Sequence, residues 1–333
     1  MEQEFAQYTQ TSSTIDQSIQ PEELSGTDYI PDEYLKGKNT KVYLAKTRNG
    51  GEVRIMKVFQ NTENGSPSGY RREIRFANVN HPNVISHYEH NNTYVERQSQ
   101  YKMDFSYIVM EFCPFGDFND VIKTGILQHD DKLVRTYFHQ LVKGLYYLHN
   151  KEIAHLDLKP GNILLGKDYN LKICDFDTAY KSGDKIVSRG TRYYRPPELK
   201  EGSCKDPYKA DIYALGTTLF NLMFGVYPHA EGKIIHGWDL TDLLYKKDLT
   251  EFFKAHYELG TIEDVDNDFF ELFSNMVKVN PKERWTLEEI ANCEWVCKEV
   301  YTDEELYELM EYHRNRNFKN CDLRGTKKIF GQQ

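Results

Sequence analysis

The chain of 333 residues carries 42 Lys and Arg residues against 51 Asp and Glu residues, a formal net charge of −9 at pH 7. This negative balance argues against nonspecific nucleic-acid binding, which depends on clustered positive charge. A hydrophobic content of 39% suffices for one large domain or two lobes. The six cysteines show no CxxC spacing, and no apolar run has the length of a membrane span or signal peptide. We therefore expect a cytoplasmic protein that does not bind membranes, with nuclear entry left open.

The first third of the chain predicts mainly strands. Residues 1–28 are rich in Gln, Ser, Thr and Glu without periodicity, which predicts a flexible leader. Residues 29–59 hold β-rich runs around the turn-prone residues 48–51, which predicts three strands. The polar stretch Glu89–Asp104 is longer than a tight hairpin needs, so we expect an extended surface loop between two strands. Residues 107–113 are typical of a further strand.

Helices are expected in the rest of the chain. Apolar residues at helical spacing predict a helix over 133–149. Residues 210–224 are apolar almost all round, which predicts a buried helix. Residues 240–300 predict further amphipathic helices. The tail 301–333 turns from acidic to basic, and it predicts one more helix followed by a frayed end.

Between the first two of these helices, residues 163–165 and 171–173 are short apolar runs joined by five turn-prone residues. This pattern predicts a β-hairpin, and a hairpin returns the chain to where it started. Asn162 and Asp175 should therefore lie close together. Their amide and carboxylate oxygens are the ligands that Mg²⁺ takes in proteins.

Residues 155–162 are His-Leu-Asp-Leu-Lys-Pro-Gly-Asn, and residues 175–177 are Asp-Phe-Asp. This stretch resembles the catalytic core of protein kinases, whose pattern is H-R-D-L-K-P-x-N followed by D-F-G. The resemblance implies an α+β, two-lobed protein kinase fold with a small β-rich N-lobe and a larger helical C-lobe. It also implies that the ATP γ-phosphate is transferred to a Ser or Thr hydroxyl of a protein substrate, with ATP and Mg²⁺ as cofactors.

Two later stretches strengthen the resemblance. Residues 190–198 match the kinase pattern G-T-x-x-Y-x-x-P-E, and by resemblance Thr191 together with Lys159 marks serine/threonine rather than tyrosine kinases. Arg284 stands where the family places the partner of Glu198, and we expect a buried ion pair. By resemblance, Asp211 ties its helix to the catalytic loop through backbone hydrogen bonds. The segment that begins at Arg284 is most similar to the calcium/calmodulin-dependent group.

The resemblance assigns roles to six residues. Asp157 would orient the substrate hydroxyl or accept its proton, and Lys159 would hold the γ-phosphate. Lys57 would hold the α- and β-phosphates. Asn162 and Asp175 would bind Mg²⁺. The sixth residue is an acidic side chain that would form an ion pair with Lys57. It is expected on the helix that follows Lys57 in the sequence.

That partner is Glu73, the only acidic residue between Glu63 and Glu89. Its distance to His81 in the sequence is eight positions, one shorter than the family leads us to expect. An exposed salt bridge on the helix surface is the alternative interpretation.

The predicted nucleotide site draws on several segments. The kinase phosphate loop aligns with residues 35–42, where only the middle glycine remains. By resemblance, Met110 guards the back of the adenine pocket, and the backbones of Glu111 and Cys113 bind the adenine edge. The full predicted set is Tyr34, Leu35, Gly37, Val42, Ile55, Lys57, Met110, Glu111, Cys113, Asp117 and Leu164.

Two departures from the family pattern are informative. Leu156 replaces an arginine that often pairs with a phosphorylated activation-loop residue, and Val187 occupies the usual phosphothreonine position. We therefore expect an enzyme that does not need activation-loop phosphorylation. Asp177 replaces the family glycine, and it is expected either to add a metal contact or to slow movement of the loop.

The predicted organisation is a leader (1–28), a protein kinase domain (29–298) and a C-terminal helix and tail (299–333). Within the kinase domain, the N-lobe is expected at 29–112 and the C-lobe at 113–298. Two alternatives stay open: a pseudokinase scaffold that binds nucleotide without turnover, and a kinase-fold enzyme that acts on small molecules. The sequence names no regulatory partner.

Overall fold

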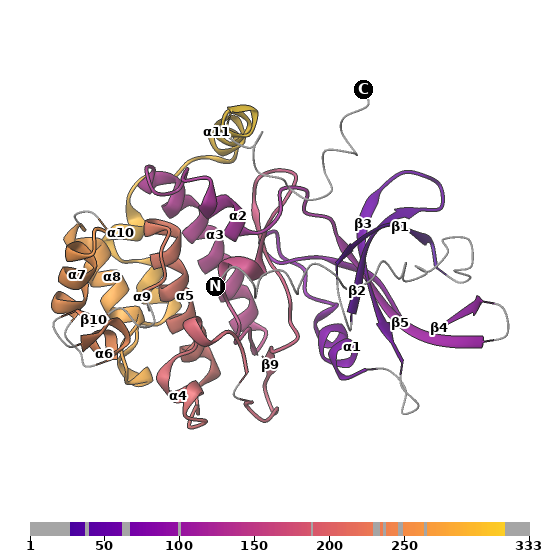
Figure 1. The fold of residues 1–333 in the computed structure, drawn as a ribbon, viewed down its shortest axis with the longest axis horizontal. Coiled ribbons are helices and arrows are strands. Elements are labelled where there is room, and N and C mark those ends of the chain that lie inside the picture. The colour runs from indigo at the N-terminus through magenta and orange to yellow at the C-terminus, as the bar shows by residue number, and fades with distance from the viewer. Residues whose placement is uncertain are drawn as a thin grey trace, which may run out of the picture. The chain divides into compact units, whose positions relative to one another are not determined.

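The structure is a computed structural model (Figure 1) that describes residues 27–36, 40–61, 67–98, 101–187, 189–228, 234–235, 238–245, 249–262 and 265–316. The chain divides into two units. The first comprises Met1–Tyr70 and Glu89–Met110, and the second comprises Arg71–Tyr88 and Glu111–Gln333. Strands build the described part of the first unit, whereas helices dominate the second.

A five-stranded sheet of order β1-β2-β3-β5-β4 forms the framework of the first unit. Its three N-terminal strands pair antiparallel, β1 with β2 and β2 with β3, as the predicted three strands require. The ladder continues through β5 to the edge strand β4. The bounds are β1 Tyr29–Lys36, β2 Thr40–Thr47, β3 Val53–Gln60, β4 His87–Gln98 and β5 Tyr101–Glu111.

The surface loop expected over Glu89–Asp104 is wrong. Strand β4 continues to Gln98 and β5 begins at Tyr101, so both strands run through this polar stretch. The physical reason is the position of β4 at the edge of the sheet. An edge strand has one side without a neighbouring strand, and polar side chains suit it better than a continuous apolar run.

Helices and short strands make up the described part of the second unit. Helix α5 packs against both α3 and α8 (Figure 1). The main helices are α1 Ser68–Glu73, which crosses from the first unit, α2 Phe118–Lys123, α3 Asp131–Asn150, α4 Pro197–Lys200, α5 Pro207–Phe224, α6 Leu240–Tyr245, α7 Leu249–Glu258, α8 Asn267–Met276, α9 Leu287–Ala291, α10 Glu294–Cys297 and α11 Asp303–Arg316. The 3₁₀ helices are η3 Ile74–Phe76, η4 Pro160–Asn162, η5 Arg192–Tyr194 and η6 Pro281–Glu283. The short strands are β6 Ile153–Ala154, β7 Ile163–Leu165, β8 Leu171–Ile173, β9 Tyr180–Lys181, β10 Ile234–Ile235 and β11 Trp238–Asp239.

The two longest described helices, α3 and α5, both have a side-chain cap at the N-terminal end. The Asp130 carboxylate accepts from the Leu133 amide at the start of α3. Asp206 caps α5 in the same way, and Gly225, with a φ of 69°, ends it. Such caps satisfy backbone groups that a helix end leaves without partners. The predicted helices over 133–149 and 210–224 are confirmed.

Helix α11 is packed onto the second unit rather than exposed all round. Its Leu306 and Met310 side chains are fully buried. Glu311 accepts a hydrogen bond of 2.6 Å from the hydroxyl of Tyr169, which lies in the turn between β7 and β8. The helix predicted for the C-terminal segment is confirmed, and the frayed end lies outside the described residues.

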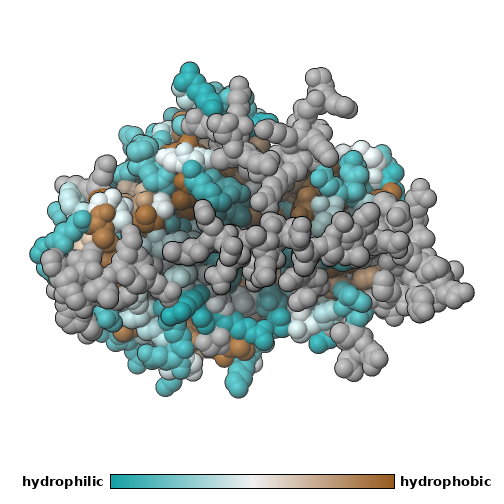
Figure 2. Space-filling model, viewed as in Figure 1, coloured by the Kyte–Doolittle hydropathy of each residue, from teal (hydrophilic) through white to brown (hydrophobic). Residues whose placement is uncertain are grey.

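One face of the described residues is mainly hydrophilic where it is coloured in Figure 2. On the face shown in Figure 2, hydrophobic residues form small separate groups among hydrophilic ones. Among the described helices, none combines the length and hydrophobicity that crossing a membrane requires.

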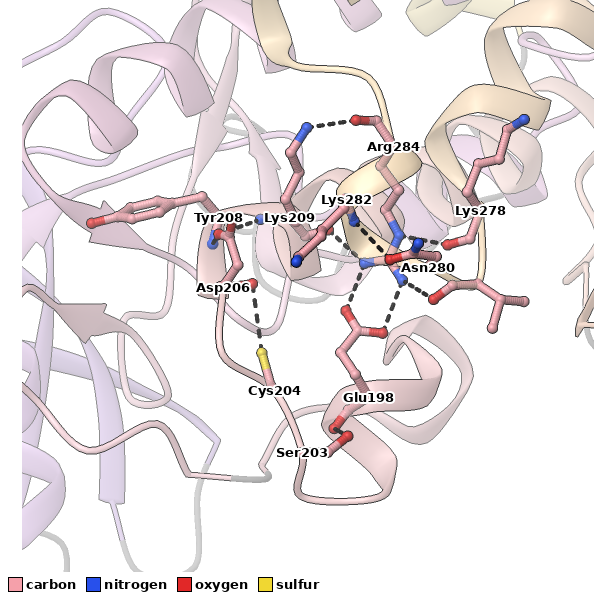
Figure 3. Close-up of polar contacts among 11 residues, drawn as sticks. Glu198, Ser203, Cys204, Asp206, Tyr208, Lys209, Lys278, Asn280, Lys282 and Arg284 are labelled. Atoms are coloured by element: carbon pink, nitrogen blue, oxygen red, sulfur yellow. Dashed lines mark hydrogen bonds and ion pairs between the residues drawn. The ribbon is translucent and has the colours of Figure 1, made fainter.

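A buried ion pair links α4 to the segment before α9 (Figure 3). Arg284 donates from Nη1 to Glu198 Oε1 at 2.6 Å and from Nη2 to Glu198 Oε2 at 2.8 Å. Arg284 also donates to the carbonyl oxygens of Lys278, Lys209 and Val279. Arg284 is 2% exposed, so these contacts must replace the hydration that its guanidinium loses. The buried pair predicted from the sequence is confirmed.

Removing the guanidinium should destabilise the fold. In the Arg284→Ala variant, the buried Glu198 carboxylate loses its partner, and we expect a loss of about 3–5 kcal/mol in the free energy of unfolding. Urea unfolding followed by circular dichroism measures it. Lys254→Ala, which breaks an exposed pair with Glu251, is the control and should change the stability by no more than about 0.5 kcal/mol. Equal effects of the two variants would contradict the prediction.

Candidate active site

The hairpin of β7 and β8 brings the two predicted metal ligands together at one end. Ile163 pairs with Ile173. One position further on, the Cys174 amide donates to the Asn162 carbonyl at 2.9 Å. Asp175 follows, and its backbone φ of 68° turns the chain away from the strand direction. The prediction that a hairpin returns Asp175 to the vicinity of Asn162 is confirmed.

The Asp157 carboxylate accepts hydrogen bonds from three neighbours. Its Oδ2 accepts from Lys159 Nζ at 2.7 Å and from Asn162 Nδ2 at 2.9 Å. Its Oδ1 accepts from the backbone amide of Thr191 at 2.5 Å. Burial raises the pKa of Asp157, but the contacts with Lys159 and Thr191 outweigh burial and lower the pKa below its usual value. Asp157 is therefore ionised at neutral pH and can accept a hydrogen bond from a hydroxyl.

Asp211 of α5 holds the backbone that leads to Asp157. Its Oδ2 accepts from the His155 amide and its Oδ1 from the Leu156 amide, both at 2.7 Å. His149 Nε2 lies 3.0 Å from the same carboxylate. These contacts secure Leu156 at a φ of 61°, which a residue with a Cβ rarely adopts. The predicted link between Asp211 and the catalytic loop is confirmed.

Phe176 connects the hairpin to the segment that carries Glu73. The Phe176 ring is fully buried, with its centroid 5.4 Å from those of Phe76 and His155. Helix α1 tightens into the 3₁₀ helix η3 immediately after Glu73. Glu73, at the end of α1, and Phe76, at the end of η3, are both buried. Since Glu73 is only 3% exposed, the exposed surface pair is not observed.

The Asp177 carboxylate lies against Arg72. Arg72 Nη2 donates to Asp177 Oδ1 at 2.7 Å, and Arg72 Nε donates to the Asp177 carbonyl at 2.8 Å. Both residues belong to the second unit. The residue that replaces the family glycine is therefore bound to the chain segment next to Glu73.

One face of the sheet in the first unit collects four of the predicted nucleotide-binding residues. Side chains alternate between faces along a strand, and Val42 pairs with Lys57 across β2 and β3. The opposite face packs into a core of Tyr43, Ala45, Met56, Val58, Phe105, Tyr107 and Val109. Alternation from these core positions puts Val42, Ile55, Lys57 and Met110 on the same face.

The other predicted residues of the first unit are not part of that group. The Tyr34 ring contacts the Tyr43 ring at 5.6 Å, so it lies on the core side of the sheet. Leu35 follows at an irregularity in the pairing of β1 with β2 and is partly buried. Gly37 lies outside the described residues.

Four predicted nucleotide-binding residues belong to the second unit. Asp117 and Leu164 form a bridge between their backbones, and Asp117 also caps α2 through the Asn119 amide at 2.9 Å. The Glu111 carboxylate pairs with Lys172 at 3.0 Å, and the Glu111 amide donates to the Ser86 carbonyl at 2.9 Å. Burial raises the pKa of the Cys113 thiol well above its ordinary value, so this residue is neutral.

The chemistry of Asn162 and Asp175 fits Mg²⁺. The Asn162 amide nitrogen donates to the carbonyl and carboxylate of Asp157, and this orients the amide oxygen away from that residue. One amide oxygen and one carboxylate suit a hard cation that keeps several waters and binds substrate phosphates. The described residues hold no group of three or more His, Cys, Asp or Glu side chains arranged around a metal. A site completed by phosphate oxygens does not need such a group.

Comparison with known families decides the classification. A profile described as the protein kinase domain matches residues 36–296. The chain belongs to the protein kinase family. The predicted α+β kinase fold is confirmed, with a strand-built first unit and a helical second unit.

Curated relatives of this kinase are serine/threonine kinases. It is 29% identical to an Aurora kinase of Schizosaccharomyces pombe over 79% of this chain and 69% of the relative. It is 32% identical to CBL-interacting serine/threonine-protein kinase 8 of Arabidopsis thaliana over 81% of this chain and 57% of the relative. It is 30% identical to serine/threonine-protein kinase kin-29 of Caenorhabditis elegans over 68% of this chain and 25% of the relative. The chain is a serine/threonine protein kinase of the eukaryotic type.

Sequence reasoning missed the site roles of Arg72 and Gly190 in this kinase. Arg72 adjoins Glu73, but its partner is 105 positions away, so sequence spacing carries no signal for the pair. Gly190 was matched only as part of a motif. Its φ is 99°, and a Cβ added there would lie 2.5 Å from the Leu156 carbonyl oxygen and 3.3 Å from Asp157 Oδ1. Glycine lets the activation segment, residues 178–198 by resemblance, approach the catalytic loop, residues 155–162, this closely.

Replacing Gly190 with alanine should displace Thr191 from Asp157. The new Cβ would clash with backbone atoms, and the positive φ would add strain. We expect Gly190→Ala to lower kcat/KM for a peptide substrate by at least about tenfold. The control is Gly202→Ala, because Gly202 also has a positive φ but open space around its Cβ position. Steady-state kinetics of both variants test this, and equal kcat/KM values would contradict the steric argument.

Proposed function

We propose that this kinase transfers the γ-phosphate of ATP to Ser or Thr hydroxyls of a protein, with the hydroxyl bound at Asp157. The observation that carries the proposal is the ionised Asp157 carboxylate held by Lys159, Asn162 and Thr191. A carboxylate with a lowered pKa is a weak base, so its main contribution is to orient the hydroxyl toward the phosphate. The second lone pairs of its oxygens can accept that hydroxyl hydrogen bond.

Lys159 would stabilise the charge that develops on the transferred phosphoryl group. Its ammonium contacts both Asp157 and the Thr191 hydroxyl. These contacts hold the positive charge beside the expected nucleophile before the reaction begins, which avoids reorganisation later. Thr191 thereby contributes to the site through its amide and its hydroxyl.

The remaining charged residues would bind the metal-bound nucleotide. Mg²⁺ with ATP supplies the phosphoryl group and neutralises phosphate charge. Asn162 and Asp175 would hold the metal through their side-chain oxygens. Lys57 would hold the α- and β-phosphates. Lys57 belongs to the first unit and Glu73 to the second. An ion pair between these two side chains remains a prediction.

A test of Asp157 separates an active enzyme from a pseudokinase. Asp157→Asn keeps the shape of the side chain but removes the charge that orients the hydroxyl. We expect kcat for transfer from Mg-ATP to a Ser/Thr peptide to fall about 10²–10⁴-fold, the usual contribution of a positioned acid or base. Nucleotide affinity, measured in the same preparations, should change little. If the wild-type chain binds ATP but its turnover equals that of Asp157→Asn, the pseudokinase alternative is correct.

We further propose that the activation segment is ordered without phosphorylation. Leu156, Ala154 and Ala210 form a buried apolar cluster, against which Tyr180 and Ile186 of the activation segment pack, together with Cys204 and Tyr208. In relatives with arginine at the position of Leu156, charge pairing orders this segment. Here Leu156 is only 5% exposed, and its burial against this segment would stabilise the ordered conformation in place of charge pairing.

Phosphatase treatment should therefore leave activity unchanged within about twofold. The Thr178→Ala and Ser188→Ala variants should also keep their activity within about twofold of wild type. Leu156→Ala should reduce activity, because truncation of a buried leucine costs about 2–5 kcal/mol in a core. Kinase assays before and after treatment, with intact-mass measurement of the phosphate content, check both statements. Loss of activity on dephosphorylation would overturn the proposal.

We propose the catalytic domain as residues 29–298, with lobes at 29–112 and 113–298, followed by a segment 299–333. The buried Leu306 and Met310 side chains support including α11 in the folded unit. The absence of CxxC spacing supports a reducing compartment, and we propose the cytoplasm.

A further inference from the structure

Arg72 and Asp177 form a close ion pair with an added backbone contact. Arg72 Nη2 and Nε donate to Asp177 Oδ1 at 2.7 and 3.1 Å, and Nε also donates to the Asp177 carbonyl at 2.8 Å. One guanidinium thus binds both the side chain and the backbone of one residue. Such charge-assisted contacts fix orientation as well as distance.

A second pair follows one helical turn later. Arg75 Nη2 lies 2.8 Å from Asp184 Oδ2 and donates to Asp184 Oδ1 at 2.9 Å. Asp184 is itself fixed, because its carboxylate accepts from the Lys181 amide at the end of β9. Arg72 and Arg75 are three positions apart, where side chains on a helical segment are neighbours. We call the four charged residues Arg72, Arg75, Asp177 and Asp184 the arginine clamp.

The arginine clamp flanks an apolar contact between the same two segments. Phe76 packs on Phe176, which is the residue directly before Asp177. Glu73 lies between the two arginines in the sequence, and Asp175 lies two positions before Asp177. The clamp therefore joins the segment that carries Glu73 to the segment that carries Asp175.

We propose that Asp177 is a positioning residue: its pairing with Arg72 holds Glu73 and Asp175 in the arrangement that phosphoryl transfer requires. This inference rests on the proposed function of those two residues. Of the two expectations for Asp177, the contacts favour restraint of the loop over an added metal contact, because Oδ1 is already bound by two guanidinium nitrogens. A glycine, as in the family pattern, can make only the backbone half of this contact.

The ion pair between Arg72 and Asp177 is partly exposed, so its strength depends on the salt concentration. The side chains of Arg72 and Asp177 are 30% and 45% exposed. Ion pairs with this exposure are screened by dissolved ions, unlike deeply buried ones. The pair is therefore suited to a charge-reversal experiment, because reversed side chains can be accommodated without burying an unpaired charge.

The test exchanges the two charges in the full chain. Arg72→Asp and Asp177→Arg, made singly, place like charges together, and each should lower kcat/KM for ATP about tenfold, within the range for charged residues in contact. The double exchange should recover activity to within about threefold of wild type. Lys254→Asp is the control for charge reversal at an exposed pair in a distant helix, and it should leave kcat/KM unchanged.

A second readout does not depend on turnover. Hydrogen–deuterium exchange of the amides in residues 71–77 should rise in each single variant and return to wild-type protection in the double variant. If wild type itself shows no turnover above Asp157→Asn, the proposed function fails, yet the exchange data still test the clamp. Restored protection without restored activity would overturn the positioning role.

The Mg²⁺ dependence distinguishes the metal-ligand alternative. Asp177→Asn removes the charge at Asp177 with little change of shape. If Asp177 is a positioning residue, the Mg²⁺ concentration for half-maximal activity should stay within about twofold of wild type while kcat/KM falls. A tenfold or greater rise in the Mg²⁺ requirement, with normal exchange protection of residues 71–77, would overturn the proposal in favour of a metal ligand.

Discussion

The catalytic loop depends on one buried carboxylate, that of Asp211. It is fully buried and accepts hydrogen bonds from the amides of His155 and Leu156. Burying a carboxylate without hydrogen-bond donors costs free energy, and so does burying an amide without an acceptor. The contact therefore satisfies both the carboxylate and the two amides. It fixes the backbone on the N-terminal side of Asp157, while Thr191 and Lys159 fix the side chain itself. The backbone that leads to Asp157 is thus held from α5, whereas the Asp157 carboxylate is oriented by Lys159 and Thr191.

The two departures from the family pattern act on the same segment by different forces. Leu156 offers a buried apolar surface to Tyr180 and Ile186. Asp177 supplies a charge that binds Arg72 at the beginning of the segment. Both contacts are made by the unmodified sequence. Neither departure removes a charge assigned to phosphoryl transfer, because Asp157, Lys159, Asn162 and Asp175 are all present.

Local patterns predicted much of this structure, and long-range contacts were predicted only where a family motif named both partners. The hairpin that places Asp175 beside Asn162 followed from short apolar runs and turn residues, and Glu198 with Arg284 followed from the motif. The polar residues of β4 led to the wrong prediction of a surface loop, because the sequence alone does not reveal which strand lies at the edge of a sheet. The contact of Arg72 with Asp177 joins positions 105 apart and has no periodic signal. Tyr34 is among the residues predicted to bind nucleotide, but it pairs with Tyr43 and their rings are in contact.

Burial divides the two arginine–carboxylate contacts into different physical roles. Arg284 and Glu198 are almost fully enclosed, so loss of either leaves a charge that water cannot reach, and the pair must persist in every folded state. Arg72 and Asp177 remain partly hydrated, so their contact can open at modest cost and close again. A pair of the first kind maintains the fold, whereas a pair of the second kind can bias one arrangement of a movable segment over another. Arg72 directly precedes Glu73 and Asp177 lies two positions after Asp175, so such a bias acts on the two segments that carry these residues.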